Sequence, residues 1–163
     1  MKLNPLTYRP IGMIHSPFKQ IRGTPIQGAL ARGAEGTVEV LEEFAEGLRD
    51  VQMFSHLYLL YAFDRATKTS LTCVPFPDDE ARGVFATRAP CRPNAIGLSV
   101  VRVLAREGRT IRVADLDVLD GTPLLDIKPY VPMFDCRPDA GAGWLTNVDC
   151  KPAEGGADER FAP

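Results

Sequence analysis

The sequence predicts a mainly β protein of one domain with short helices. Several segments alternate apolar and polar residues, as half-buried strands do, and turn residues separate them. The glycine patterns GxGxxG, GxxxxGK[ST] and GxSxG are absent from the chain. About five to seven short strands are therefore expected, arranged as a barrel or a curled sheet.

Four elements are assigned in the first half of the chain. Residues 8–16 predict a first strand with Pro10 near its start, where a missing N–H is tolerated. Residues 37–41 alternate and predict a half-buried strand, and residues 42–48 predict a short helix with one apolar face. The aromatic and leucine-rich residues 54–63 predict a buried central strand.

The second half predicts three further strands, at residues 83–87, 98–104 and 110–116. Turn residues 106–109 join the last two strands as a hairpin, and Val118 continues the alternation of the second. Before these strands, the chain holds two long loops rich in turn residues, and ordered loops of such length are often functional.

Domain organisation follows from length and composition. With 163 residues, of which 45% are hydrophobic, the chain suits one ordinary domain. We expect this domain over residues 1–149 and a disordered tail over residues 150–163. No apolar run approaches the roughly 20 residues that span a bilayer, and the N-terminus lacks a signal-peptide pattern. A cytoplasmic protein with no membrane partner, whose cysteines are free thiols, is expected.

Charge is unevenly distributed along the chain. Residues 82–112 hold seven Arg and one acid, whereas residues 35–50 hold six acids and one Arg. One basic and one acidic face would account for this pattern, and so would two ordinary solvated strand faces. The net charge of −2 argues only weakly against a nucleic-acid partner.

The first candidate site is the stiff turn at residues 87–99. Its prolines fix φ, and Gly97 permits a close approach of the backbone or a positive φ. Arg88, Arg92 and Asn94 would then be held in preset positions against a ligand. The alternative is that Asn94 caps the turn and that the arginines are solvated.

The second candidate site is the acidic segment that begins at Asp115. Asp115 and Asp117 share one face of a strand by its period of two, and Asp120 begins a turn. Carboxylates in such a cluster accept hydrogen bonds from a ligand amine or ribose, or bind magnesium through oxygen atoms alone. The first use is preferred, and no metal site is assigned. The alternative is that Asp120 caps the loop and that Asp126 pairs with Lys128.

Three isolated side chains have both a catalytic and a structural interpretation. His15 and His56 are lone histidines, for which a packed or hydrogen-bonded role is preferred. Cys91 has no His or Asn arranged to activate a thiolate, so a small space-filling role is preferred over that of a nucleophile.

Taken together, four segments of the chain resemble the TrmO family, also called YaeB or TsaA-like. These segments are IGMIHSPF, FSHLYLLYAF, GVFATRAPCRPNAIGLS and DLDVLDGTPLLDIKPYVP, and the last two are long and specific. Members of this family are S-adenosylmethionine-dependent methyltransferases that act on N6 of threonylcarbamoyl-adenosine beside the anticodon of certain tRNAs. The resemblance therefore implies S-adenosylmethionine as cofactor and tRNA as partner.

The resemblance also implies a single β-barrel domain, unlike the Rossmann-type methyltransferase fold, that works as a homodimer. The chain departs from the family at Ile26, where many members have Arg, and it shows no counterpart of the small C-terminal domain that bacterial members often carry. The positions that match the family's cofactor contacts are Pro25, Ile26, Gln27, Asp64, Arg65, Arg88, Leu98, Asp117, Val118, Leu119 and Asp120.

Roles in the implied reaction are assigned by chemistry. An adenine N6 amine is a poor nucleophile, so an oxygen that accepts its N–H would help, and Asn94 and Asp126 are the catalytic candidates. Substrate binding is assigned to Arg92, Lys128 and Tyr130, with Arg88 as an alternative cation for phosphate or the threonyl carboxylate. The competing hypotheses are a cofactor-binding module, a methyltransferase with a non-tRNA substrate, and a structural adaptor that binds no cofactor.

Overall fold

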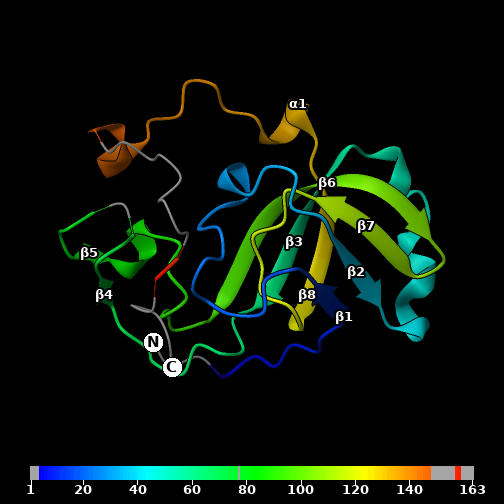
Figure 1. Cartoon of the computed structure of the whole chain (residues 1–163), viewed down its shortest axis with the longest axis horizontal. Helices are drawn as coiled ribbons and strands as arrows, with labels where there is room; N and C mark the ends of the chain where they lie inside the picture. Colours follow the sequence, from blue (N-terminus) through cyan, green and yellow to red (C-terminus); the bar gives the residue numbers. More distant parts are fainter. Residues whose placement is uncertain (1–3, 77, 148–156, 159–163) are drawn as a thin grey trace.

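The protein is a closed antiparallel β-barrel with short helices around it, as the sequence predicted. The computed structural model describes residues 4–76, 78–147 and 157–158. Six strands follow each other around the barrel in the order β1-β2-β7-β6-β3-β8, in the right-hand half of Figure 1. Their bounds are β1 (Gly12–His15), β2 (Gly36–Val40), β3 (His56–Ala62), β6 (Ile96–Glu107), β7 (Thr110–Ala114) and β8 (Thr122–Pro129).

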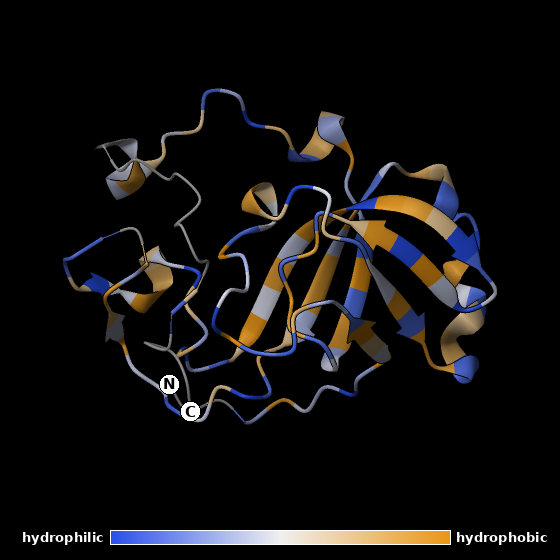
Figure 2. Ribbon diagram, viewed as in Figure 1, coloured by the Kyte–Doolittle hydropathy of each residue, from blue (hydrophilic) through white to orange (hydrophobic). Residues whose placement is uncertain are grey.

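The core forms because every second residue of these strands points into the barrel. On β3 the buried residues are Leu57, Leu59 and Tyr61, and the residues between them are partly exposed. The same alternation appears as bands of hydrophobic and hydrophilic colour along the strands in Figure 2. β3 lies between β6 and β8, so the predicted central strand is confirmed, although only its inner face is buried.

The helices of the described residues are all short. Five are 3-10 helices: η1 (Gly28–Leu30), η2 (Glu42–Leu48), η3 (Val51–Met53), η4 (Val84–Ala86) and η5 (Gly143–Asn147). One is an α-helix, α1 (Pro132–Asp135). The predicted helix at residues 42–48 is confirmed in extent and is a 3-10 helix in type. Within the described ranges, no helix has the length and apolar character needed to cross a membrane.

A second, two-stranded sheet lies beside the barrel, at the left of Figure 1. It pairs β4 (Thr72–Cys73) with β5 (Arg82–Gly83). The predicted strand at residues 83–87 was wrong, because the chain turns into η4 directly after β5. The Val84 carbonyl accepts hydrogen bonds from the Thr87 amide and from the Arg92 guanidinium, so the segment needs no strand neighbour.

The acidic segment also differs from its prediction. β7 ends at Ala114, and Asp115 has a φ of 65°, which breaks the strand alternation. The predicted shared face of Asp115 and Asp117, and the continuation of the strand to Val118, were therefore wrong. β8 was not predicted as a strand, because its apolar and polar residues do not alternate regularly. Two leucines follow each other where a bulge lies opposite Leu60 and Tyr61.

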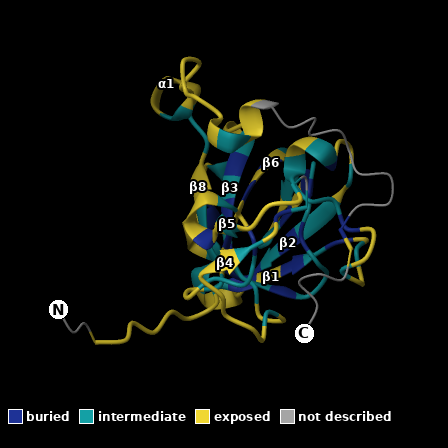
Figure 3. Cartoon of the chain, turned by 90° about the vertical axis from the view of Figure 1, so that its left-hand side faces the viewer, coloured by how far each residue is buried: buried dark blue, intermediate teal, exposed yellow. Residues whose placement is uncertain are grey.

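The two ends of the described chain differ: the first is exposed and the second is in part buried. Residues 4–10 extend from the barrel as an exposed segment, and the first strand begins only at Gly12 (Figure 3). In the predicted tail, Ala157 is buried and pairs through its backbone with Gly23 and Thr24, at 3.0 and 2.8 Å. Apart from residues 157–158, the predicted tail lies outside the described residues.

Candidate functional site

A hydrogen bond joins the two motifs that flank the proposed cofactor position. The Arg88 Nη1 atom donates to Gln27 Oε1 at 2.7 Å, although 61 positions separate the two residues. Gln27 directly precedes η1, and Arg88 follows η4. The Gly- and Pro-rich loop and the stiff turn, which the sequence analysis treated separately, therefore form one surface.

Gly28 explains why η1 can lie so close to the barrel wall. A Cβ atom built on Gly28 would lie 3.0 Å from the Asp115 carbonyl oxygen and 3.3 Å from that of Val100. Glycine therefore permits η1 to approach β6, and Leu98 and Val100 are 47% and 38% exposed on the outer face of that strand. An open cavity of about 520 Å³ lies here, and its lining residues include Gly28, His56, Val100, Arg102 and Asp115.

Asp117 lies beneath this surface as a largely buried carboxylate. Its Oδ1 atom accepts a hydrogen bond from Ser99 Oγ at 2.5 Å, and Ser99 Oγ lies 3.0 Å from the Tyr61 hydroxyl. Burial raises the pKa of Asp117, while hydrogen bonds from Ser99 and the Gly28 backbone and the positive charge of Arg88 oppose that shift. Burial also raises the pKa of Tyr61, which is therefore a neutral donor.

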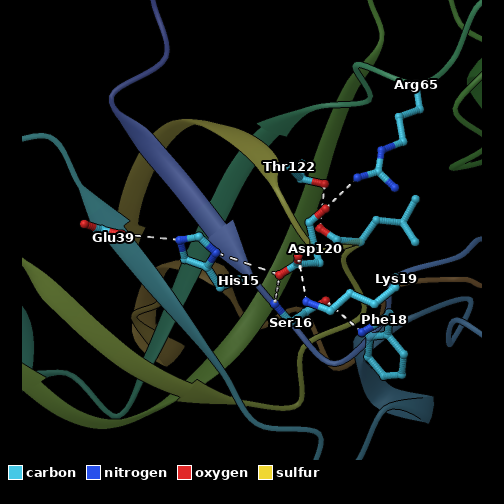
Figure 4. A network of polar contacts seen from close by, with 9 residues as sticks. His15, Ser16, Phe18, Lys19, Glu39, Arg65, Asp120 and Thr122 are labelled. Carbon is cyan, nitrogen blue, oxygen red and sulfur yellow. Dashed lines mark hydrogen bonds and ion pairs between the residues drawn. The ribbon is translucent and has the colours of Figure 1, made fainter.

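Asp120 belongs to a second polar cluster, at the turn between β7 and β8 (Figure 4). Its carboxylate accepts from the Ser16 amide at 3.0 Å and pairs with Lys19 Nζ at 2.7 Å. Lys19 and the Ser16 amide hold the pKa of Asp120 below its usual range. The Arg65 Nη2 atom donates to the Asp120 carbonyl oxygen at 2.7 Å, so the predicted residues Arg65 and Asp120 are brought together.

The remaining residues of the predicted cofactor set are distributed around these two clusters. Pro25 and Ile26 are half-buried in the loop before Gln27, and Asp64 is exposed directly after β3. Val118 is buried in the core and Leu119 is half-buried beside it. The Leu119 carbonyl accepts from the Thr122 hydroxyl at 2.8 Å, which closes the turn.

The two predicted catalytic residues lie on different elements, Asn94 in a turn and Asp126 on β8. Asn94 is exposed in the turn before β6, and its side chain makes no hydrogen bond within the described part of the chain. Asp126 lies opposite Leu60 on β8; one of its oxygens accepts from the Ile127 amide, and the other pairs with Lys128 at 2.7 Å. The structure records no contact between Asn94 and Asp126.

The residues assigned to the substrate have different surroundings. The Arg92 guanidinium donates to the carbonyl oxygens of Val84 and Thr87 at 3.0 and 3.1 Å and so fixes the turn that carries Arg88. Lys128 is exposed on β8. Tyr130 packs edge-on against Tyr58, with ring centroids 5.5 Å apart.

Sequence reasoning missed Tyr61 and Ser99. Ser99 occupies a core-facing position of β6, between Gly97 and Val101, and is 4% exposed. A polar residue at an inward position of an otherwise apolar strand is the signal that could have identified it, because such a hydroxyl requires a buried partner.

Cys91 lies in the stiff turn as a thiol, as do the other free cysteines of the described ranges, Cys73 and Cys136. Burial and the nearby Cys73 raise the pKa of the Cys91 thiol. A raised pKa disfavours the thiolate, so the geometry supports the preferred structural role.

The sequence of this chain is similar to those of known proteins. The profile of the tRNA-methyltransferase O N-terminal domain matches residues 13–136. A probable S-adenosyl-L-methionine-binding protein of Pyrococcus abyssi is 54% identical over 156 residues, which cover 96% of this chain and 85% of that protein. The tRNA (adenine(37)-N6)-methyltransferase of Escherichia coli is 33% identical over 86% of this chain and 64% of its own length.

The fold is also similar to that of solved structures. The crystal structure of TrmO from Pseudomonas aeruginosa superposes with a TM-score of 0.73 and 41% sequence identity, over 86% of this chain. The match covers 63% of the Pseudomonas aeruginosa chain, so this chain corresponds to slightly less than two thirds of it.

Proposed function

Because the chain belongs to the family of tRNA-methyltransferase O N-terminal domains, as its sequence resemblance indicated, we propose that it is an S-adenosylmethionine-dependent tRNA methyltransferase. Its substrate in this proposal is N6 of threonylcarbamoyl-adenosine beside the anticodon. The observation that carries the proposal is the hydrogen bond between Gln27 and Arg88, which unites the loop and the turn around one surface.

The residues around this surface fit the chemistry of the cofactor. Arg88 supplies a guanidinium for a carboxylate group, and the Asp117 carboxylate can accept from a ribose hydroxyl or an amine. Leu98 offers an exposed apolar side chain to a flat purine ring. When bound, S-adenosylmethionine supplies an electrophilic methyl carbon on a sulfonium.

The chain's own residues would act by positioning. Methyl transfer forms the N–C bond as the C–S bond breaks, in line, and N6 loses a proton, so alignment accounts for much of the rate. Asn94 is the better candidate to accept the N6 hydrogen bond, because its amide oxygen has no partner among the described residues while both oxygens of Asp126 are engaged. The proposed contacts for tRNA remain Arg92, Lys128 and Tyr130. A tRNA substrate would place the protein in the cytoplasm.

A homodimer is part of the same proposal. Ile96 and Val100, on either side of the proposed cofactor contact Leu98, are 36% and 38% exposed along the outer face of β6. A contiguous apolar stripe on a strand that also carries a proposed cofactor contact suits burial against a second copy of the chain. Light scattering of Ile96→Lys against the wild type tests this assembly: a dimer that becomes monomeric supports it, and an unchanged mass contradicts it.

Two measurements test the activity. Calorimetry with S-adenosylmethionine should show binding by the wild type and about tenfold or greater weakening by Arg88→Ala. Arg49→Ala, which changes an exposed arginine paired with Glu46, should bind as the wild type does. Labelled methyl transfer to bulk tRNA, with nucleoside analysis, should then yield the N6-methylated product. Cofactor binding without tRNA methylation would favour a binding module or another substrate, and absence of binding would favour a structural adaptor.

A further inference from the structure

A chain of two buried hydroxyls connects β3 to the Asp117 carboxylate through the interior of the barrel. Tyr61 and Ser99 are 5% and 4% exposed, and their oxygens lie 3.0 Å apart. Ser99 Oγ is in turn 2.5 Å from Asp117 Oδ1. Both hydroxyls are thus screened from water and connected to a single charged group.

The direction of these hydrogen bonds follows from the carboxylate. An ionised carboxylate only accepts, so Ser99 donates its one proton to Asp117. Ser99 Oγ then has only lone pairs to offer to Tyr61, and Tyr61 must donate to Ser99. The donor order from Tyr61 through Ser99 to Asp117 is therefore fixed as long as Asp117 is ionised.

The Tyr61 ring is held in place by its neighbours. Gly97 leaves the space that the ring occupies, since a Cβ atom there would lie 2.1 Å from Tyr61 Cε2. Phe63 packs edge-on against the ring, with centroids 5.4 Å apart. The Tyr61 hydroxyl consequently has little freedom to leave Ser99.

Asp117 faces the proposed cofactor surface at the other end of this chain. Its Oδ2 atom lies 3.9 Å from the Cβ position of Gly28, the first residue of η1, and the Gly28 backbone hydrogen-bonds the carboxylate. Arg88 acts on the same carboxylate through its positive charge. Asp117 thus lies between the interior hydroxyls and the residues proposed to hold the cofactor.

We propose that Tyr61 and Ser99 are positioning residues, which hold the Asp117 carboxylate aimed at η1 so that it accepts a hydrogen bond from S-adenosylmethionine. This inference rests on the proposed function and adds two residues that contact no cofactor themselves. Their effect is transmitted through Asp117 alone.

Binding should then depend on pH. The groups that face Asp117 are Tyr61 from β3, Ser99 from β6, Gly28 from η1 and Arg88 from the stiff turn. Burial raises the pKa of Asp117 above its ordinary value of 3.8, so the acceptor is lost as pH falls through that raised pKa. Removing the Ser99 hydroxyl removes an interaction that lowers this pKa, so the pH at which affinity is half lost should rise.

The experiment is calorimetry of S-adenosylmethionine binding between about pH 4 and 7, below the range in which an α-amino group titrates. Ser99→Ala should weaken binding about tenfold at neutral pH and move the midpoint upward, because a hydrogen bond to a charged group is lost. Tyr61→Phe should move the midpoint in the same direction by a smaller amount. Asp117→Asn should bind weakly with no midpoint in this range, and the exposed Tyr8→Phe should behave as wild type.

The outcomes separate this inference from the proposed function. Wild-type protein that binds no cofactor at any pH contradicts the proposed function and with it the inference. Wild-type binding whose pH midpoint is the same in Asp117→Asn or in Tyr61→Phe overturns the inference alone. If Ser99→Ala does not fold, as judged by circular dichroism, Tyr61→Phe decides the matter, since it removes one oxygen and leaves the ring in place.

Discussion

Gly97→Ala should destabilise the protein through one identifiable collision. The added Cβ would lie 2.1, 2.4 and 2.7 Å from Cε2, Cζ and Cδ2 of Tyr61. Carbon atoms in ordinary contact are about 3.5–4.0 Å apart, so the buried ring must move by about 1 Å or more. Gly97 has no positive φ, so its requirement for glycine comes from the approach of this ring and not from its backbone conformation.

The cost can be estimated from the two interactions that change. Overpacking of a filled core costs about 1–3 kcal/mol, and loss of the Tyr61–Ser99 hydrogen bond adds about 1 kcal/mol. We therefore expect Gly97→Ala to lower the free energy of unfolding by about 2–4 kcal/mol. Gly47→Ala is the matched control, because a Cβ on Gly47 meets no atom within 4 Å.

The assay is urea unfolding of the wild type and both variants, followed by circular dichroism. A double-mutant cycle with Tyr61→Leu adds a second readout, since Gly97→Ala should cost at least about 1 kcal/mol less once the ring is absent. The reasoning is refuted if Gly97→Ala unfolds within about 0.5 kcal/mol of the wild type, or if the cycle shows no coupling.

Three further predictions concern the polar clusters and the stiff turn. Asp120→Asn should lower the free energy of unfolding by about 1 kcal/mol at neutral pH, because the charge on Lys19 loses its partner. Since the pKa of Asp120 is lowered in the folded state, this stability difference should disappear as pH falls below the ordinary carboxyl pKa of 3.8, and a difference that persists in acid would contradict the assignment. Arg92→Lys should lower the free energy of unfolding by about 1–2 kcal/mol, since an ammonium cannot reproduce the two carbonyl contacts of one guanidinium. Hydrogen exchange should then show faster opening at residues 84–92, and unchanged exchange would show that Arg92 does not fix the turn. Cys136, which is exposed, should react with iodoacetamide faster than Cys91, whose thiol pKa is raised by burial, and peptide mass spectrometry that finds Cys91 modified first would refute this.

Local patterns in the sequence were sufficient for the strands whose alternation is regular. The predictions for β2, β3 and the β6–β7 hairpin are confirmed, because inward and outward residues alternate along most of each strand, although the β6–β7 register shifts between Val103 and Ala105. The pattern failed at β8, where the bulge beside Leu60 shifts the register by one residue. It also failed at residues 83–87, where a side chain from Arg92 satisfies the backbone in place of a neighbouring strand.

Some parts of the candidate site could be predicted from local sequence patterns and others could not. The stiff turn and the acidic segment were identifiable because prolines, glycines and carboxylates have local meanings that do not depend on the rest of the chain. Lys19, Ser16 and Arg65 could not be assigned to the environment of Asp120, because none of them is near it in sequence and each contact exists only where β1, β3 and β8 meet. Only the fold revealed which of the predicted side chains are free and which already have partners.

Arg88 and Asp117 show the two contributions most clearly. The sequence by itself determined that each lies in a motif suited to a ligand, and it determined the family through the order and length of those motifs. Tertiary structure decided that Arg88 contacts Gln27 and that Asp117 is supported from inside the barrel by Ser99 and Tyr61. The physical reason is that alternation states which way a side chain points, whereas the closure of the barrel and the register of its strands decide what it meets.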